Sequence, residues 1–154
     1  MPAPRTPTVA LLARTLLVPY VIGVALIVWL PASIAGRVTG LAFRLARFVS
    51  ENFGISLSTS YTVFEFLANI ALFVPFGLLL AAAWPRRSPW LIILIGYATS
   101  ATIELVQTLL PSRVPALSDV VANTLGTVIG CLALHAVLRM SHAGRRLRAS
   151  TVDA

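Results

Sequence analysis

Four long apolar runs dominate the chain, and short polar segments separate them. The runs cover residues 9–30, 64–84, 90–110 and 120–138. About 20 consecutive, mostly apolar residues are enough for an α-helix to cross a lipid bilayer, so each run predicts a transmembrane helix. The first run is marginal because Arg14 interrupts it near its start. A guanidinium at that position can snorkel to the cytoplasmic surface.

Residues 34–51 follow a different pattern. Apolar side chains recur at helical spacing through this segment, at Ile34, Val38, Leu41, Leu45 and Phe48. Arginines and a glutamate fall on another face, and only Phe43 breaks the pattern. We expect an amphipathic helix on the outer membrane surface. It either covers the outer mouth of the bundle or contacts anionic lipid or a polyanionic wall polymer.

The pattern therefore predicts an all-α membrane protein, a bundle of about four transmembrane helices with one amphipathic interfacial helix. Residues 85–89 form a tight turn, so the second and third spans should be antiparallel neighbours. We divide the chain into an N-terminal membrane anchor with the outer amphipathic segment (1–63), a three-helix core (64–138) and a basic cytoplasmic tail (139–154). The tail is polar and is expected to be loose from Ser141.

Composition agrees with a chain embedded in lipid. Of its 154 residues, 58% are hydrophobic and 11% are charged, and the mean hydropathy is +0.89. A soluble domain averages about 25% charged residues. The net charge of +7 comes from 12 basic residues, all of them arginine. Because these lie mainly outside the apolar runs, they indicate membrane topology, and no nucleic-acid partner is expected.

The arginines also predict the orientation of the spans. In a four-span topology, one side of the membrane holds Arg5, Arg14, Arg86, Arg87, Arg139, Arg145, Arg146 and Arg148. The other side holds fewer arginines together with acidic residues, so the positive-inside rule places both termini in the cytoplasm. An alternative for the N-terminal region is cleavage after the small residues around Ile34, as in a signal peptide. Cleavage there would leave the other spans unchanged.

Polar side chains inside the apolar runs are few, and they recur at similar depth. An ionisable residue within a span is costly and is by default a candidate functional residue. Asn69, Glu104 and Asn123 lie roughly 6–9 Å inside the outer boundary, at a rise of about 1.5 Å per residue. The candidates at or beside this level are Asn69, Glu104, Gln107, Arg113, Asp119 and Asn123.

Each candidate also has a structural explanation. Asp119 is suited to cap the fourth span, and the two asparagines and Gln107 are suited to hydrogen bonds between helices. Glu104 needs a partner or a proton, and an ion pair with Arg113 would supply the partner. Arg113 could equally pair with Asp119 or with an anionic ligand.

Other features predict packing rather than chemistry. The spacing of Gly126 and Gly130 permits close approach of helices, and Pro75 should kink the second span. We expect no functional role for His135, and Cys131 cannot form an intrachain disulfide because it is the only cysteine.

The motifs of zinc, serine-hydrolase and nucleotide-binding sites are absent from the sequence, so no metal site and no cofactor are expected. Glu104 and Asp119 are the candidates for acid–base chemistry if the protein is an enzyme. Two carboxylates with nearby amides are too generic a set to establish a catalytic or divalent-cation site.

Several of these residues belong to longer motifs. Residues 69–77, NIALFVPFG, resemble the N-x-x-x-F-x-P-F-G segment of the VanZ-like family, and residues 104–107, ELVQ, are similar to its E-x-x-Q. Residue 113 and residues 119–126, DVVANTLG, are similar to its R…D-V-x-x-N-T-x-G, with a further glycine one turn later. The match covers about residues 64–135. The positions that carry it are Asn69, Phe73, Pro75, Phe76, Gly77, Glu104, Gln107, Arg113, Asp119, Asn123, Gly126 and Gly130.

The resemblance implies a multi-pass protein of the bacterial plasma membrane. It also implies a family associated with low-level resistance to teicoplanin and without an established enzymatic activity. Three hypotheses follow. The protein binds an envelope component at its outer polar layer, for which membrane lipids, a lipid-linked cell-wall precursor or a lipoglycopeptide would fit. It is an enzyme that uses Glu104 and Asp119 on a lipid-linked substrate. It is a structural subunit of a larger membrane complex. Its oligomeric state does not follow from the sequence.

Overall fold

The computed structural model describes residues 7–29, 32–109 and 116–152, and these ranges contain five α-helices and no β-strand. The helices are α1 (Pro7–Trp29), α2 (Ala32–Phe53), α3 (Leu57–Ala83), α4 (Pro89–Gln107) and α5 (Leu117–Val152). In lipid, a helix is favoured because it pairs its backbone polar groups internally. The predicted all-α membrane fold is confirmed.

Four of the described helices, α1, α3, α4 and α5, are long and apolar enough to cross a membrane. They coincide with the four apolar runs, although α3 begins earlier than residue 64. Ser56 caps its N-terminus by accepting a hydrogen bond from the Thr59 N–H at 3.1 Å, which favours a helix that begins at Leu57. The boundary expected between residues 63 and 64 therefore falls inside one helix.

The last helix also differs from expectation. We predicted a loose tail from Ser141, and this is wrong because α5 continues to Val152. Residues 143–149 read AGRRLRA. Alanine, leucine and arginine are strong helix formers, and a helix already nucleated in the bundle propagates readily through them.

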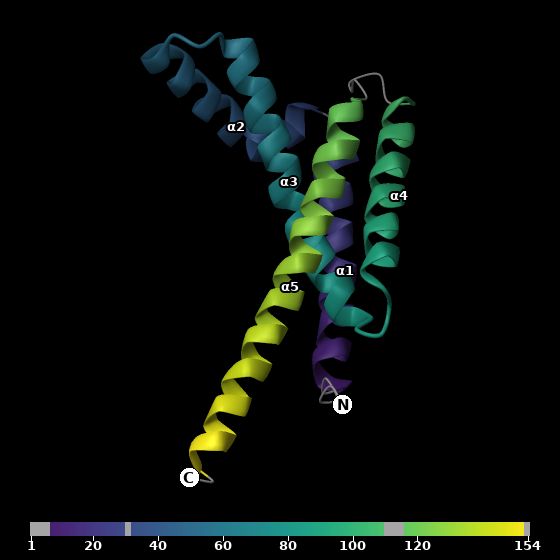
Figure 1. Cartoon of the computed structure of the whole chain (residues 1–154). Coiled ribbons are helices and arrows are strands. Elements are labelled where there is room, and N and C mark those ends of the chain that lie inside the picture. The colour runs from purple at the N-terminus through teal and green to yellow at the C-terminus, as the bar shows by residue number, and fades with distance from the viewer. Residues whose placement is uncertain (1–6, 30–31, 110–115, 153–154) are drawn as a thin grey trace.

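Helix α3 is central to the fold, because it contacts each of the other four helices. It runs obliquely across the bundle, and its first half leans outwards together with α2 to form a projecting arm (Figure 1). The start of α1 and the end of α5 lie at the opposite end of the molecule (Figure 1). The chain turns between α2 and α3 at Gly54, whose φ of 70° favours glycine.

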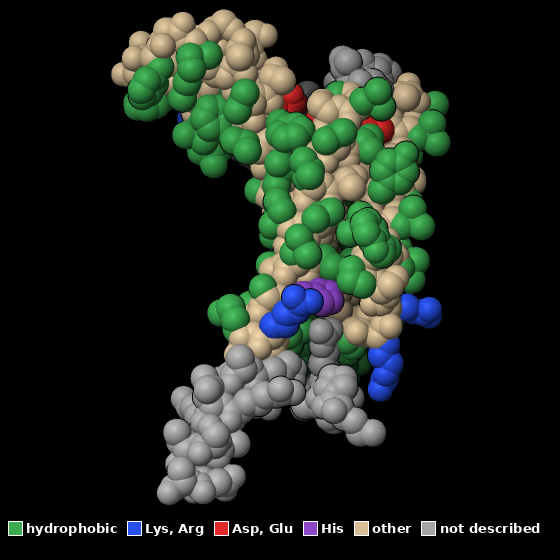
Figure 2. Space-filling view, viewed as in Figure 1, with side chains coloured by type: hydrophobic (Ala, Val, Ile, Leu, Met, Phe, Trp, Pro, Cys, Tyr) green, Lys and Arg blue, Asp and Glu red, His purple; other side chains and the backbone are tan. Residues whose placement is uncertain are grey.

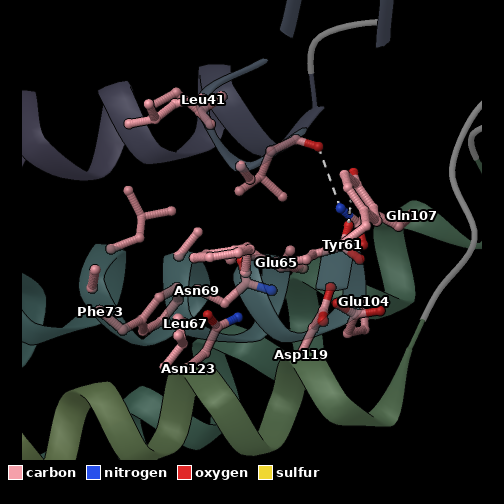
Figure 3. A pocket seen from close by; sticks show the side chains of 18 of the residues that line it. Leu41, Tyr61, Glu65, Leu67, Asn69, Phe73, Glu104, Gln107, Asp119 and Asn123 are labelled. Carbon is pink, nitrogen blue, oxygen red and sulfur yellow. Dashed lines mark hydrogen bonds between the residues drawn. The ribbon is translucent and has the colours of Figure 1, made fainter. Parts of the chain in front are cut away.

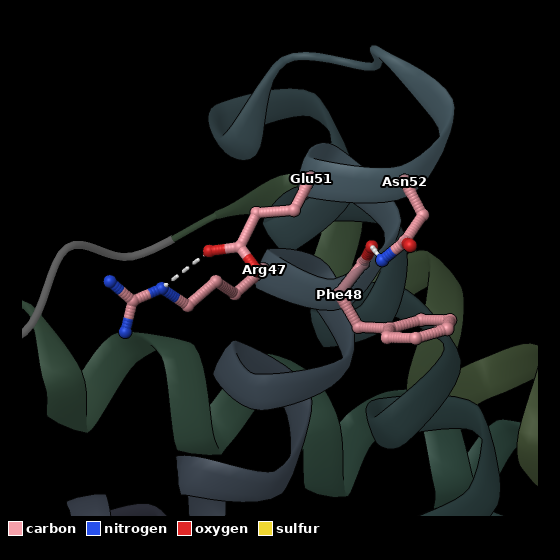
Figure 4. Close-up of polar contacts among 4 residues, drawn as sticks. All are labelled: Arg47, Phe48, Glu51 and Asn52. Carbon is pink, nitrogen blue, oxygen red and sulfur yellow. Dashed lines mark hydrogen bonds and ion pairs between the residues drawn. The ribbon is translucent and has the colours of Figure 1, made fainter.

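Helix α2 is the predicted amphipathic helix, and it packs against α3. Arg47 Nε donates to Glu51 Oε1 at 3.1 Å on its polar side, whereas the Phe48 ring points to the other side (Figure 4). Phe43, which interrupted the apolar pattern, makes an edge-on contact with the Tyr61 ring of α3, with the ring centroids 6.4 Å apart. Phe43, the exception in the sequence pattern, therefore contributes to the contact between α2 and α3.

Glycines bring α3 and α5 into close contact. A Cβ atom added at Gly126 would overlap the Ile70 carbonyl oxygen, and one added at Gly130 would overlap the Val74 carbonyl oxygen. Gly77 of α3 faces the backbone of α5 in the same way. Both contacts advance by four residues on each helix, so α3 and α5 run in the same direction where they cross. The predicted role of the glycines in packing is confirmed.

Helix α1 is attached to the end of α3 by Arg14. Its Nε donates to the Ala83 carbonyl oxygen at 3.1 Å, and its guanidinium carbon lies 5.7 Å from the centroid of the Trp84 ring. A positive charge is favourable at the C-terminal end of a helix. Arg14, expected to snorkel out of the first span, therefore also stabilises the end of a neighbouring helix.

Side chains divide along the molecule by type. Figure 2 shows apolar side chains distributed along the visible face of the bundle, as expected of a surface in contact with lipid. Basic side chains gather near the end where α3 meets α4 (Figure 2). Acidic side chains appear near the other end, between the projecting arm and the tops of α4 and α5 (Figure 2).

The glycine contacts predict a selective effect of one added methyl group. We expect Gly130→Ala to destabilise the protein by about 1–3 kcal/mol, because backbone atoms of α3 would have to move. Gly23→Ala is the matched control, since a Cβ there meets nothing within 4 Å. The midpoints of thermal unfolding in detergent measure the difference. Equal midpoints for the two variants would contradict the close contact.

Candidate functional site

A cavity of about 610 Å³ lies among all five helices. This volume is within the range of about 300–1,000 Å³ that is typical of small-molecule sites. Five of the six residues predicted for the polar cluster line it, namely Asn69, Glu104, Gln107, Asp119 and Asn123. The sixth, Arg113, lies outside the described residues. The structure thus brings together the polar side chains of three helices that the depth estimate placed at one level.

The cavity is polar at one end and apolar at the other. Figure 3 shows Glu104, Gln107 and Asp119 together at one end. Phe73 lies towards the other end, and Leu41 of α2 faces it across the cavity (Figure 3). The site therefore has the two-part character that suits an amphiphilic molecule.

Glu104 closes the polar end from α4. Glu104 is 9% exposed. Its Oε2 atom accepts a hydrogen bond at 2.8 Å from the N–H of Ala116, the residue just before α5 begins. A carboxylate that accepts from a backbone amide makes a charge-assisted bond, which is stronger than a neutral one. Glu104 consequently positions the start of α5. The proposed pair with Arg113 stays a prediction, because that residue is not among those described.

Asp119 links the first turn of α5 to α3. A negative charge is favourable at the N-terminal end of a helix, which is the basis of the capping explanation for Asp119. The side chains of Asn69 and Ser118 lie close enough to interact with its carboxylate. The carboxylates of Asp119 and Glu104 lie close enough to repel each other. Asp119 therefore lies where the first turn of α5 meets α3 at the cavity, and its role as a cap stays a prediction.

Asn123 is the most enclosed of the polar candidates, with 4% of its surface exposed. Its Nδ2 atom donates to Ser100 Oγ of α4 at 2.8 Å, so it is a hydrogen-bonding contact between helices, as anticipated. Its Oδ1 atom has no hydrogen-bond partner among the described residues. Buried polar atoms are seldom left in this state, because an unsatisfied acceptor costs about 1–3 kcal/mol.

Gln107 ties α4 to the end of α1. Its Nε2 atom donates to the Val28 carbonyl oxygen at 3.3 Å (Figure 3). The last carbonyl groups of a helix lack intrahelical partners, so this amide satisfies one of them. Gln107 therefore completes the wall of the cavity where α1 and α4 meet.

The comparison with protein families agrees with these motifs. A family model described as VanZ/LLP1 matches residues 17–139, which is most of the chain. The chain belongs to the VanZ-like family. No curated protein and no solved structure matched it significantly. The matched range includes every residue that lines the cavity.

The remaining VanZ-like motif residues pack around the site. Phe73 and Phe76 are buried and meet edge-on, with ring centroids 5.4 Å apart. The Tyr20 hydroxyl of α1 donates to the Leu72 carbonyl oxygen, in the turn of α3 before Pro75. The two phenylalanines of the motif therefore belong to the packed core beside the cavity.

Two parts of the site were not predicted as such from the sequence. Tyr20 of α1 and Tyr61 of α3 line the cavity, as do Leu41 and Leu45 of α2. Leu41 and Leu45 lie on the apolar face of the amphipathic segment, which was a signal that this face would be covered. Of the two alternatives for this segment, its place in the lining favours the one in which it covers the mouth of the bundle.

Metal binding has no visible basis in the described part of the chain. Within these residues, no group of three or more His, Cys, Asp or Glu side chains is arranged to hold a metal ion. The cavity offers carboxylate and amide oxygens along one side and hydrocarbon along the other. Such a lining suits an organic ligand with a polar and an apolar part.

The contacts of Glu104 predict different effects for two substitutions. Glu104→Leu should destabilise the protein by about 1–3 kcal/mol, because the Ala116 N–H would be left without an acceptor. Glu104→Gln keeps an acceptor of the same shape and should retain most of the stability. Thermal unfolding of the purified variants measures both effects. If the two variants were equally destabilised, the negative charge rather than the accepted hydrogen bond would be the stabilising feature.

Proposed function

We propose that this VanZ-like protein binds an amphiphilic component of the bacterial cell envelope in the five-helix cavity, without catalysing a reaction. The observation that carries the proposal is the cavity itself, which joins a polar end to an apolar wall among the family's motif residues. A lipid-linked cell-wall precursor or a lipoglycopeptide has this two-part chemistry. Low-level protection against teicoplanin would follow if the bound component limits access of the antibiotic to its target.

The proposal places the polar end of the cavity at the outer face of the plasma membrane and both termini in the cytoplasm. Arg86 and Arg87 support this orientation, since they lie in the turn between α3 and α4, and Arg139 supports it because it lies near the end of the apolar span of α5. The arm formed by α2 and the start of α3 would then lie at the outer surface.

Thiol labelling in cells tests the orientation. In a Cys131→Ala background, Ser58→Cys should react with a membrane-impermeant reagent in intact cells, whereas Ser141→Cys should react only after permeabilisation. Both serines are exposed and lie near opposite ends of the bundle. The reverse pattern of labelling would invert the topology and place the cavity on the cytoplasmic side.

Occupancy of the cavity is tested by filling it. Ala68 lines the cavity, and Ala68→Phe should reduce the amount of envelope amphiphile that copurifies with the protein by about tenfold or more, because the added ring occupies its volume. Ala98→Phe is the matched control, since Ala98 is exposed on α4 and is not among the lining residues. Native mass spectrometry measures the bound fraction. Undiminished binding by folded Ala68→Phe would exclude this cavity.

The same variants report on resistance in a strain that lacks the gene. Wild type and Ala98→Phe should restore teicoplanin protection, whereas Ala68→Phe at equal membrane levels should not. If all three restore it, the cavity has no part in protection. If none does, resistance is not a task of this protein. The binding proposal is then tested only by the amount of amphiphile that copurifies with it.

An enzymatic role is the second candidate, because the Glu104 and Asp119 carboxylates meet at the polar end and two carboxyl groups can share acid and base roles. A product that wild type forms from the bound amphiphile, and that Glu104→Gln does not form, would establish catalysis. In a structural subunit of a larger complex, by contrast, Glu104→Gln would lower the abundance of the protein as much as its function.

A further inference from the structure

Arg14 carries a positive charge inside an apolar span, and its side chain is exposed. A charge in this position is costly unless a partner compensates it. The described residues provide the Ala83 carbonyl oxygen and the face of the Trp84 ring. A guanidinium has several N–H donors, and only the Nε–H of Arg14 has a hydrogen-bond partner among the described residues. Arg14 therefore keeps donors and charge for a group outside the protein.

The turn between α3 and α4 brings two more arginines to the same place. The Arg87 N–H donates to the Trp84 carbonyl oxygen at 3.0 Å, and such a turn keeps the Cα atoms of its first and fourth residues within about 7 Å. Arg86 lies inside the turn, and both arginines are exposed. The turn leads into α4, whose N-terminal end favours a negative charge. Two arginines and a helix N-terminus therefore lie beside the contact between Arg14 and Trp84.

Acidic residues lie elsewhere in the chain, which has five of them. Glu51, Glu65, Glu104 and Asp119 belong to α2, the first half of α3, the end of α4 and the start of α5, all towards the opposite end of the bundle (Figure 2). The fifth, Asp153, follows α5, whose last turns extend beyond the apolar span. The residues before α1 include no acidic residue. In the described part of the chain, no carboxylate therefore compensates the arginines at this end.

The depth of these arginines in the membrane indicates what does compensate them. Trp84 and Trp90 lie on either side of the turn and are 39% and 79% exposed, and tryptophan side chains favour the level of the lipid headgroups. Leu11 and Leu16, close to Arg14 on α1, are also exposed and offer apolar surface to lipid chains. An acidic protein or a nucleic acid would have to displace lipid to reach this level. A lipid phosphate lies there already.

We propose that Arg14, Trp84, Arg86 and Arg87, here called the arginine site, bind the headgroup of an anionic phospholipid. Guanidinium groups match the geometry of phosphate oxygens, and they would repel the ammonium group of a zwitterionic headgroup. The lipid phosphate then joins α1 to the turn after α3. The arginine site and the polar end of the cavity lie at opposite ends of α4, roughly 27 Å apart, so the inference does not depend on the proposed function. In the orientation proposed above, the lipid belongs to the cytoplasmic leaflet.

Competition between two lipids tests the inference. Full-length protein is placed in nanodiscs that contain dioleoylphosphatidylglycerol and dioleoylphosphatidylcholine in equal amounts. The two lipids share their chains and a phosphate, and only phosphatidylglycerol has a net negative charge. Native mass spectrometry measures the ratio of the two bound lipids within one sample of folded protein. We expect wild type to retain phosphatidylglycerol over phosphatidylcholine by about tenfold or more, because each basic residue near the surface attracts anionic lipid.

A pair of double variants separates the arginine site from net charge. Arg86→Gln/Arg87→Gln keeps the backbone bond of the turn and should lower the ratio by at least about fivefold. Arg44→Gln/Arg47→Gln is the matched control, since it removes the same charge from exposed positions of α2 at the other end. The control should leave the ratio unchanged. An equal fall in the two double variants would overturn the inference.

Two further arms separate a lipid site from diffuse attraction and from a site for free phosphate. Arg145→Gln/Arg148→Gln removes two charges from the part of α5 beyond the apolar span and should change the ratio less than about twofold. A loss as large as that of Arg86→Gln/Arg87→Gln would show diffuse attraction and overturn the site. Inorganic phosphate in large excess should leave the ratio unchanged. If it displaces phosphatidylglycerol, the arginines bind a free anion, and the assignment to lipid falls.

Fluorescence of Trp84 tests the location of the bound lipid. The chain has three tryptophans, so Trp29→Phe/Trp90→Phe leaves Trp84 as the only one. Phosphatidylglycerol with brominated chains should quench its emission at a mole fraction about fivefold lower than brominated phosphatidylcholine. Arg14→Gln in the same background should remove this difference. Equal quenching by the two lipids with all three arginines present would overturn the inference.

Discussion

The close contact between α3 and α5 is the constraint on which the rest of the structure depends. Lipid offers little hydrophobic driving force between helices, so close packing at small residues and hydrogen bonds must hold them together. Gly126 and Gly130 let α5 meet the backbone of α3, and this sets the register between the two helices. That register places Asn69 beside Asp119. The first half of α3 leans away from the bundle (Figure 1). Residues of α2 complete the lining of the cavity beside it.

Polar residues inside the spans serve structure and candidate function together. Glu104 holds the start of α5, and Gln107 satisfies the end of α1. These bonds compensate for the cost of placing polar groups in lipid. Gln107 uses an amide donor in its bond, whereas Glu104 uses an acceptor oxygen. The structural and functional explanations of these residues are therefore not alternatives, because the side chains that hold the helix ends also line the cavity.

Prediction from the sequence succeeded where a property is local. The spans followed from apolar length, and the polar level followed from counting residues along each helix from its outer end. The end predicted for the last helix was wrong, because hydropathy marks where a chain leaves lipid and does not mark where its helix ends. Phe43 appeared only as an exception to the pattern for a related reason, since its partner Tyr61 lies on another helix. The start of α3 could have been inferred from Ser56, which precedes the run and has the side chain of a helix cap.

The sequence by itself determined the helical class, the four spans, the depth of the polar residues and the family. The first three depend on composition, period or spacing along single segments, and the family depends on motifs that are read directly along the chain. Only the tertiary structure decided that α2 and Tyr20 complete the wall of a cavity, that Glu104 bonds Ala116, and that Asn123 keeps one acceptor without a partner among the described residues. These features depend on the tilt of α3 and on its register against α5. Both arise from contacts between residues far apart in the chain, which no local pattern contains.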